Sequence, residues 1–148
     1  MKIRVLIIVI LMTLPFAMFG QIRNGFWQSD SPNVSDTYDE GYKFRGNTFE
    51  YCVSGYDGLN PIVGFGGTYI VKNKQIFFTI TFMRKLIGGQ LSRDEFETSN
   101  NFWSLNGGKL TTIALDKPIK EEASIEIFKE YIEIDGDKFY LIKEQKDS

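Results

Sequence analysis

The chain has 148 residues, with 17 lysines and arginines against 19 aspartates and glutamates, one cysteine and no histidine. Its length predicts a single domain, and a lone cysteine excludes an internal disulfide. Without histidine, a serine or cysteine nucleophile lacks its usual general base, and a zinc ion lacks its commonest ligand. The aromatic content of 15% and the 14 glycines favour a compact all-β domain.

The first twenty residues have the pattern of a secretory signal peptide. Lys2 and Arg4 form a positive start, Val5–Leu14 is an apolar run, and residues 15–20 break that run and end in a small residue. The run is shorter than the roughly 20 residues that a membrane-spanning helix needs. We therefore expect a signal peptide at residues 1–20, a mature domain at residues 21–148 without a permanent membrane anchor, and a secreted or periplasmic location.

The charge of the mature domain argues against polyanionic partners. Removal of residues 1–20 takes away two basic side chains and no acidic one, so the domain is more acidic than the whole chain, whose formal net charge is −2. An acidic domain is repelled by nucleic acids and by anionic membranes. We expect no nucleic-acid partner.

Four segments of the mature chain alternate between apolar and polar residues on both sides of a short turn sequence, which is the pattern of a β-hairpin. These segments comprise residues 42–51, 67–82, 101–115 and 131–143. Consecutive hairpins predict an antiparallel meander.

The turn of the first hairpin fixes which of its side chains share a face. With Gly46 and Asn47 in the turn, Lys43 lies opposite Glu50 on one face, and the other face is aromatic. The aromatic set is Tyr42, Phe44, Phe49 and Tyr51.

The same reasoning predicts apolar faces for two further hairpins. An Asn73-Lys74 turn groups Gly67, Tyr69, Val71, Ile76, Phe78, Ile80 and Phe82. In the last hairpin, either Asp135-Gly136 or Gly136-Asp137 can form the turn. Both alternatives put Ile132, Ile134, Phe139 and Leu141 on one face. The register of the hairpin at residues 101–115 stays open.

Sheets with one wet face and one aromatic face must close on themselves or stack in pairs. Closure into an antiparallel meander β-barrel of about eight to ten strands is the simplest solution for one short chain. Two segments do not follow the pattern. Residues 83–100 are too long for a tight turn, and the capping-box spacing of Ser92 and Glu95 predicts a short helix around residues 92–98 in a surface loop or lid. Residues 117–131 fit a helix or a strand, and we favour a strand from about Ser124.

The order of short motifs resembles that of a known family. Gly25-Phe26-Trp27 opens the mature domain where the first strand is expected, a Y-x-F…F hairpin and a glycine-rich G-G-T-Y strand follow, and Asp135–Lys143 ends with an aromatic and a basic residue. This G-x-W start resembles the lipocalins of the calycin group, and more closely the small secreted lipocalin-like proteins of Bacteroidetes-type bacteria.

The resemblance implies a role for Gly25 and Trp27 at the closed end of a barrel. The Trp27 ring would fill this end, with a basic side chain of the last strand on its face, for which Lys138 and Lys143 are the candidates. The alternative is that Trp27 is an ordinary core residue of any β-sandwich.

The resemblance also implies a small hydrophobic ligand in the barrel interior, bound by the inward aromatic face. The candidate ligand-binding residues are Tyr42, Phe44, Phe49, Tyr51, Tyr69, Phe78, Phe82 and Trp103. In the alternative, these rings fill the interior, and the protein is an interaction or inhibitor-like module without a pocket.

No set of residues in the sequence has the pattern of a catalytic or metal site. Cys52 falls on the charged face of the first hairpin, and the acidic residues at 94–97 lie in the charged segment. Asp135 and Asp137 flank a turn glycine, where such residues are favoured for backbone reasons, and calcium would need more oxygen ligands. We expect a non-catalytic protein without a cofactor or metal.

Overall fold

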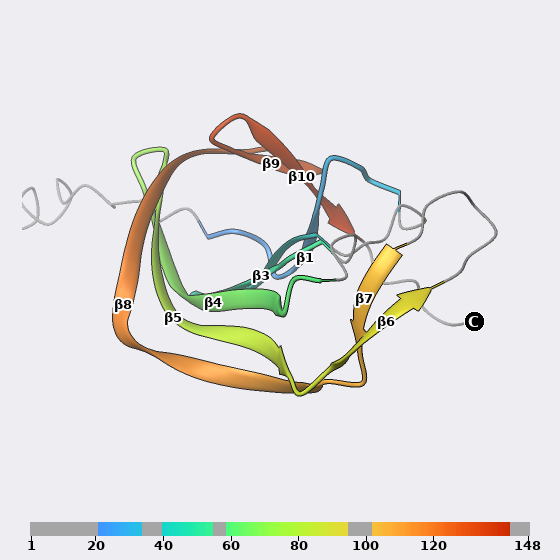
Figure 1. The fold of residues 1–148 in the computed structure, drawn as a ribbon. Coiled ribbons are helices and arrows are strands. Elements are labelled where there is room, and N and C mark those ends of the chain that lie inside the picture. The colour runs from blue at the N-terminus through green and yellow to red at the C-terminus, as the bar shows by residue number, and fades with distance from the viewer. Residues whose placement is uncertain (1–20, 34–39, 55–58, 95–101, 143–148) are drawn as a thin grey trace, which may run out of the picture.

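The computed structural model describes residues 21–33, 40–54, 59–94 and 102–142, and within these ranges the chain forms strands and no helix (Figure 1). The strands are β1 (Gly25–Ser29), β2 (Gly41–Arg45), β3 (Thr48–Cys52), β4 (Ile62–Lys72), β5 (Gln75–Ile87), β6 (Gln90–Asp94), β7 (Phe102–Asn106), β8 (Lys109–Ile127), β9 (Tyr131–Ile134) and β10 (Asp137–Ile142).

Eight of these strands form one antiparallel sheet that closes into a ring. The order around the ring is β1-β10-β9-β8-β5-β4-β3-β2, and β1 closes it by pairing with both β10 and β2. Each strand of the ring pairs with the next ring strand along the chain, so the predicted all-β antiparallel meander is confirmed. Closure pairs the sheet edges and encloses the apolar faces of the strands.

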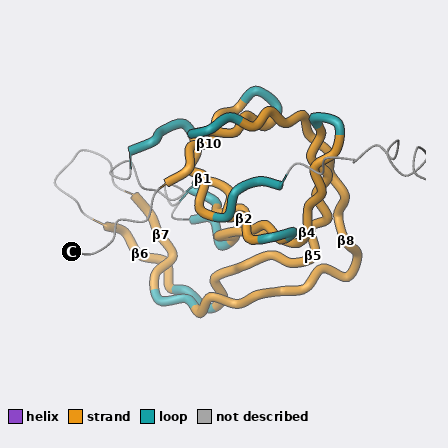
Figure 2. Tube along the Cα trace, turned by 180° about the vertical axis from the view of Figure 1, so that it is seen from behind, coloured by secondary structure: helices purple, strands orange, loops and turns teal. Residues whose placement is uncertain are grey.

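The two remaining strands, β6 and β7, pair with each other in a separate ribbon. The ribbon lies beside the ring at one end of the molecule in both views (Figures 1 and 2). It follows the long β5–β8 pair along the chain and turns away from it at a bend (Figure 1).

Along each strand, alternate side chains point into the ring, and most of these are apolar and form the core. The residues of this core are Ile22, Trp27, Phe44, Phe49, Tyr69, Val71, Ile76, Phe78, Ile125, Ile132, Ile134 and Phe139. Leu141 packs against them, so the predicted apolar face of the last hairpin is confirmed.

The first hairpin has the predicted register. Tyr42 pairs with Tyr51, and Phe44 pairs with Phe49. Since Phe44 and Phe49 belong to the core, the aromatic face of this hairpin is turned to the interior. The turn residues alone were enough to place these four side chains.

Two other hairpin turns have backbone angles that suit the twist of their strands. Asn73 and Lys74 have φ angles of 52° and 61°, and Asp135 and Gly136 have φ angles of 49° and 92°. Positive φ at both central positions is the type I′ pattern. The pairing confirms the predicted Asn73-Lys74 turn and selects Asp135-Gly136 from the two alternatives for the last hairpin.

A β-bulge in β5 corrects part of the predicted face of the second hairpin. Ile80 pairs with Gly67, but the next pair joins Phe82 to Gly66, so Thr81 is an extra residue on β5. One extra residue reverses the side to which the following residues point. Phe82 therefore lies on the outer surface against Gly66, and its predicted place on the interior face is wrong.

The predicted hairpin at residues 101–115 is also wrong. β7 pairs with β6, and β8 pairs with β5 from Lys109 onwards. The chain bends at a glycine pair on each side, Gly88-Gly89 between β5 and β6 and Gly107-Gly108 between β7 and β8. Gly88 and Gly107 have φ angles of 77° and 74°, which glycine adopts without strain. The two arms of one long hairpin thus bend at the same point.

The segments that do not follow the hairpin pattern are strands where the structure describes them. β5 continues to Ile87 and β6 follows it, so most of residues 83–94 is paired strand and not a surface loop. Ser92–Asp94, the start of the predicted helix, lies in β6, and residues 95–98 lie outside the described part. Residues 117–127 are strand, in agreement with the strand that we favoured for this segment. The strand begins at Lys109 and not at about Ser124.

β8 bends where its pairing with β5 is interrupted. Ala114 pairs with Phe82 and Ile119 with Ile80, so residues 115–118 lie opposite a single residue of β5. Pro118 cannot donate a hydrogen bond to a sheet, which suits this unpaired position. In Figure 1, β8 turns a corner and then wraps around one side of the ring.

The predicted signal peptide at residues 1–20 and the second basic candidate, Lys143, lie outside the described residues. Within the described ranges, no helix is long and apolar enough to cross a bilayer.

Candidate functional site

The interior of the ring contains a cavity of about 350 Å³. Every ring strand except β1 contributes to its lining, because alternate residues of each strand point inward. The lining residues are Tyr42, Phe49, Tyr51, Phe65, Phe78, Ile80, Glu121, Glu122, Ala123, Ile134, Asp135, Asp137 and Phe139. The volume suits a small molecule, since ligand pockets begin at roughly 300 Å³.

Tyr42 lies at the centre of the aromatic wall of this cavity. Its ring stacks on Phe78 with the centroids 5.7 Å apart and meets Tyr51 and Phe139 edge-on at 4.8 and 4.9 Å. Phe49 extends the wall, with its centroid 4.7 Å from that of Phe78. These are favourable geometries for aromatic pairs, so the rings hold one another in place and the wall is preformed.

Four of the eight predicted ligand-binding residues line the cavity, namely Tyr42, Phe49, Tyr51 and Phe78. Phe44 and Tyr69 are also buried, but they pack on each other, with centroids 4.9 Å apart, and are absent from the lining. The Tyr69 hydroxyl donates a hydrogen bond of 2.9 Å to the Gly46 carbonyl oxygen, so its polar end is satisfied away from the cavity. These two rings form part of the solid core.

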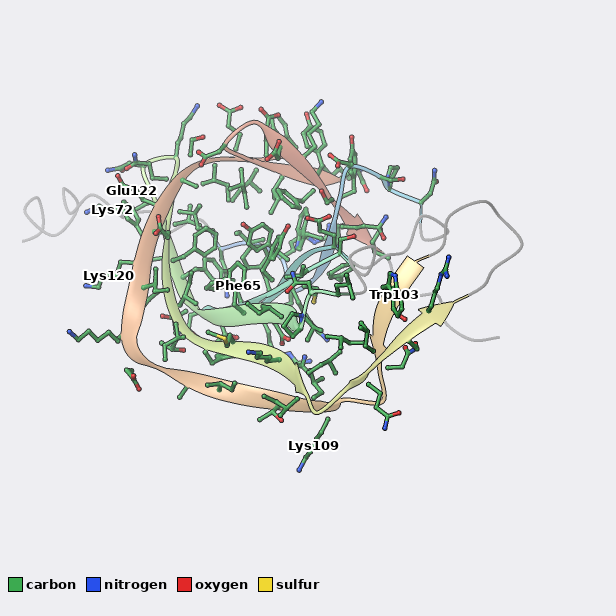
Figure 3. The ribbon with its side chains drawn as sticks, in the orientation of Figure 1. Phe65, Lys72, Trp103, Lys109, Lys120 and Glu122 are labelled. Atoms are coloured by element: carbon green, nitrogen blue, oxygen red, sulfur yellow. The ribbon has the colours of Figure 1, made fainter. Side chains whose placement is uncertain are left out.

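The other two predicted residues lie outside the ring interior. Phe82 follows the bulge in β5 and borders an outer hollow with Lys43 and Glu50. Trp103 lies in β7, on the separate ribbon, and 49% of its surface is exposed (Figure 3). The structure therefore does not bring either of them to the cavity.

Several lining residues are missing from the predicted set. Phe65 points into the ring (Figure 3). Counting back by two from Tyr69 along the same strand would have placed it there. Phe139 lies on the predicted inner face of the last hairpin. Glu121 precedes Ser124, where the strand was expected to begin, so no sequence pattern pointed to it.

The charged residues of the lining are all acidic. Glu121 pairs with Phe78 and Asp137 pairs with Ile134, and since both partners are buried, both carboxylates belong to the inner face of the sheet. Asp135 accepts hydrogen bonds of 2.7 and 3.0 Å from the backbone nitrogen and hydroxyl of Ser124, which hold its carboxylate at the turn.

Neighbouring charged residues point the other way. Glu122 lines the cavity from the same strand, but its side chain points away from the interior, as do those of Lys72 and Lys120 (Figure 3). Among the described lining residues there is no lysine or arginine. The charge of the cavity is therefore negative.

Two tyrosines of the wall have raised pKa values. Burial, and then the charges of Asp135 and Asp137, raise the pKa of Tyr42 to about 12. Burial and the hydrogen bond of 2.7 Å that the Tyr51 hydroxyl donates to Glu40 raise the pKa of Tyr51. Both hydroxyls keep their protons at ordinary pH, and the negative charges of Asp135 and Asp137, at the acidic rim formed with Glu121, act on the cavity wall.

Trp27 is fully buried, and Gly25 begins the same strand. The indole nitrogen of Trp27 donates a hydrogen bond of 2.9 Å to the Arg23 carbonyl oxygen, so its polar end is satisfied. The predicted position of Lys138 on the Trp27 face is wrong. Its amino group lies 5.3 Å from the Tyr131 ring centroid, because Lys138 alternates with the buried Phe139 and faces outward.

The described residues do not form a metal cluster: no group of three or more Cys, Asp or Glu side chains there is close enough to hold an ion. Cys52 pairs with Gly41 and Gly64, one position beyond the inward-facing Tyr51, so its side chain lies on the outer face as predicted. The cavity offers rings, carboxylates and neutral hydroxyls, which can bind a molecule.

Comparisons of this chain with known protein families, with curated protein sequences and with solved structures found no match.

Proposed function

We propose that this protein is a non-catalytic, lipocalin-like binding protein that holds a small hydrophobic molecule inside its ring of strands. We also propose that residues 1–20 are a cleaved signal peptide and that the mature protein is secreted or periplasmic. In this proposal the ring is a barrel of the calycin type.

The observation that carries the proposal is the preformed aromatic cavity of about 350 Å³. A core filled only for stability packs at crystal-like density and leaves few voids larger than a water molecule. Here six aromatic residues surround open volume, and three of them, Tyr42, Tyr51 and Phe65, are only half-buried. Concave apolar surfaces of this kind bind small molecules.

The order of the strands and motifs supports the likeness to lipocalins. The ring strands follow one another along the chain, as in up-and-down barrels that hold ligands. Gly25-Phe26-Trp27 lies at the start of the first strand, and its tryptophan is buried.

A thermal-unfolding experiment with octanol tests the binding proposal. A ligand that binds only the native state raises the melting temperature with increasing concentration. We expect octanol to raise the melting temperature by about 2–5 °C when present at many times its dissociation constant. Ala123→Phe, which puts a ring into the cavity, should remove this effect.

Ala114→Phe is the matched control. Ala114 lies in the same strand but is exposed and does not line the cavity, so the variant makes the same chemical change elsewhere. It should keep the response to octanol. A wild-type protein whose melting temperature is insensitive to octanol, or equal responses of the two variants, would contradict the proposal.

The second candidate function is that of a protein-interaction module. The β6–β7 ribbon favours it, because Leu91 and Trp103 are 60% and 49% exposed. Leu91 pairs with Leu105, and Trp103 pairs with Arg93. Since these pairs are two positions apart, Leu91 and Trp103 lie on the same face of the ribbon. An interaction module needs no response to octanol, so the same experiment separates the two candidates.

A further inference from the structure

The cavity is not neutral, and this restricts what it can hold. Its apolar wall would accept any small hydrophobic molecule, but the charged residues around it are all carboxylates. Glu121 and Asp137 face inward from β8 and β10, and Asp135 lies between β9 and β10. The negative charge therefore comes from β8, β9 and β10, which are neighbours in the ring.

The position of these carboxylates argues against a ligand with its own negative charge. A carboxylate or sulfate group near the rim would meet Glu121 and Asp137 without an arginine or lysine among the described lining residues to pair with it. Like charges at short range raise the free energy of the complex.

The aromatic wall adds a second preference in the same direction. The face of an aromatic ring carries partial negative charge and attracts a cation within about 6 Å of its centroid. Tyr42, Tyr51 and Phe65 line the cavity together, with Tyr42 next to Tyr51 at 4.8 Å and Tyr51 next to Phe65 at 5.2 Å. The faces of these rings and the carboxylates beside them therefore both favour a positively charged group.

A bare metal ion fits this arrangement poorly. Metal ions need several ligand atoms at short distance, and no group of three or more described carboxylates is placed to hold one. An organic cation needs no such convergence, because its charge is spread over a larger group and its hydrophobic part contacts the rings.

We propose that the cavity binds an organic cation, an amine or quaternary ammonium group attached to an apolar body, with the cationic group between the acidic rim and the aromatic wall. This inference rests on the proposed function, because it requires a ligand inside the ring.

Three probes with the same eight-carbon tail test the inference on the full chain. Octyltrimethylammonium carries a positive charge, octanol is neutral and octanoate carries a negative charge. Calorimetric titration below the micelle concentration gives their dissociation constants. We expect the cation to bind at least about tenfold more tightly than octanoate, with octanol between them, and we expect this difference to shrink with added salt.

Charge-removing variants locate the preference. Glu121→Gln and Asp137→Asn are changes at exposed positions, so they should leave the fold intact. Each should weaken binding of octyltrimethylammonium by about threefold and leave octanol unchanged. Glu133→Gln is the matched control: it removes the same charge from β9, at a residue that alternates with the buried Ile132 and Ile134, faces outward and does not line the cavity, and it should have a much smaller effect.

The outcomes separate this inference from the proposed function. If octanol and octyltrimethylammonium bind equally and the variants change neither, the cavity binds ligands without selecting charge and the inference fails alone. If octanoate binds most tightly, the inference is also overturned. If none of the three probes binds, the proposed function fails and the inference fails with it.

Discussion

The ring holds two aromatic regions that differ in packing. Trp27, Phe44 and Tyr69 are almost fully buried, and the polar atoms of Trp27 and Tyr69 donate hydrogen bonds to backbone carbonyls. Tyr42 and Phe65 are only half-buried, and both border the cavity. Residues of the same type thus fill space in one region and enclose it in the other.

The difference shows that aromatic content does not by itself indicate a binding site. Phe44 and Tyr42 are two positions apart on one strand and face the same interior, yet only Tyr42 lines the cavity. The two residues differ in the side chains of the strands that lie near them. Near Tyr42, the β8 side of the ring contributes Glu121 and Ala123, an acid and a small side chain, so the volume between the strands is left open.

Trp27→Ala tests the packed region and should have the largest effect. Removal of a fully buried indole leaves a void that the surrounding strands cannot close, and we expect a loss of about 3–5 kcal/mol in the free energy of unfolding. Chemical denaturation monitored by circular dichroism measures it. A loss below about 1 kcal/mol would mean that this region is not tightly packed.

A matched pair of substitutions compares the two regions directly. Phe44→Ala removes a ring that is 1% exposed, whereas Phe65→Ala removes a half-buried ring that already borders open volume. We expect Phe44→Ala to cost about 3–4 kcal/mol and Phe65→Ala about 1–2 kcal/mol, because less contact is lost at the cavity.

The same two variants should differ in the opposite sense in ligand binding. Phe65→Ala should weaken binding of octanol, and Phe44→Ala should leave it unchanged in the fraction that stays folded. Equal losses of stability together with equal effects on octanol binding would remove the distinction between a packed region and a cavity.

Much of the fold could be predicted because its hairpins are local. Turn residues such as Gly46-Asn47 and Asn73-Lys74 fix the register of their strands, and register fixes the interior face. The four predicted ligand-binding residues that line the cavity followed from this alone. The predictions failed where a single residue changes the pattern, as at Thr81, whose bulge moves Phe82 to the outer surface.

The remaining errors concern pairing between distant segments. β7 is adjacent in sequence to β8 but pairs with β6, since glycine pairs let both arms of the long hairpin bend together. Glu121 reaches the cavity only because β8 pairs with β5, some 40 residues earlier in the chain. Periodicity within one segment carries no information on such partners, so the position of Glu121 at the cavity could not be predicted.

The outer face of the ring should be the most tolerant, and Cys52→Ser gives the smallest expected effect. Cys52 alternates with the inward-facing Tyr51, so its side chain lies on the outer surface, where a hydroxyl can be solvated in place of the thiol. We expect a change of less than about 0.5 kcal/mol in the free energy of unfolding, measured with and without reducing agent. Tyr51→Ser at the adjacent position is the contrast, because it removes a ring of the cavity wall. A loss for Cys52→Ser as large as that for Tyr51→Ser would mean that the side chains of β3 face the opposite way, which would take Tyr51 out of the cavity.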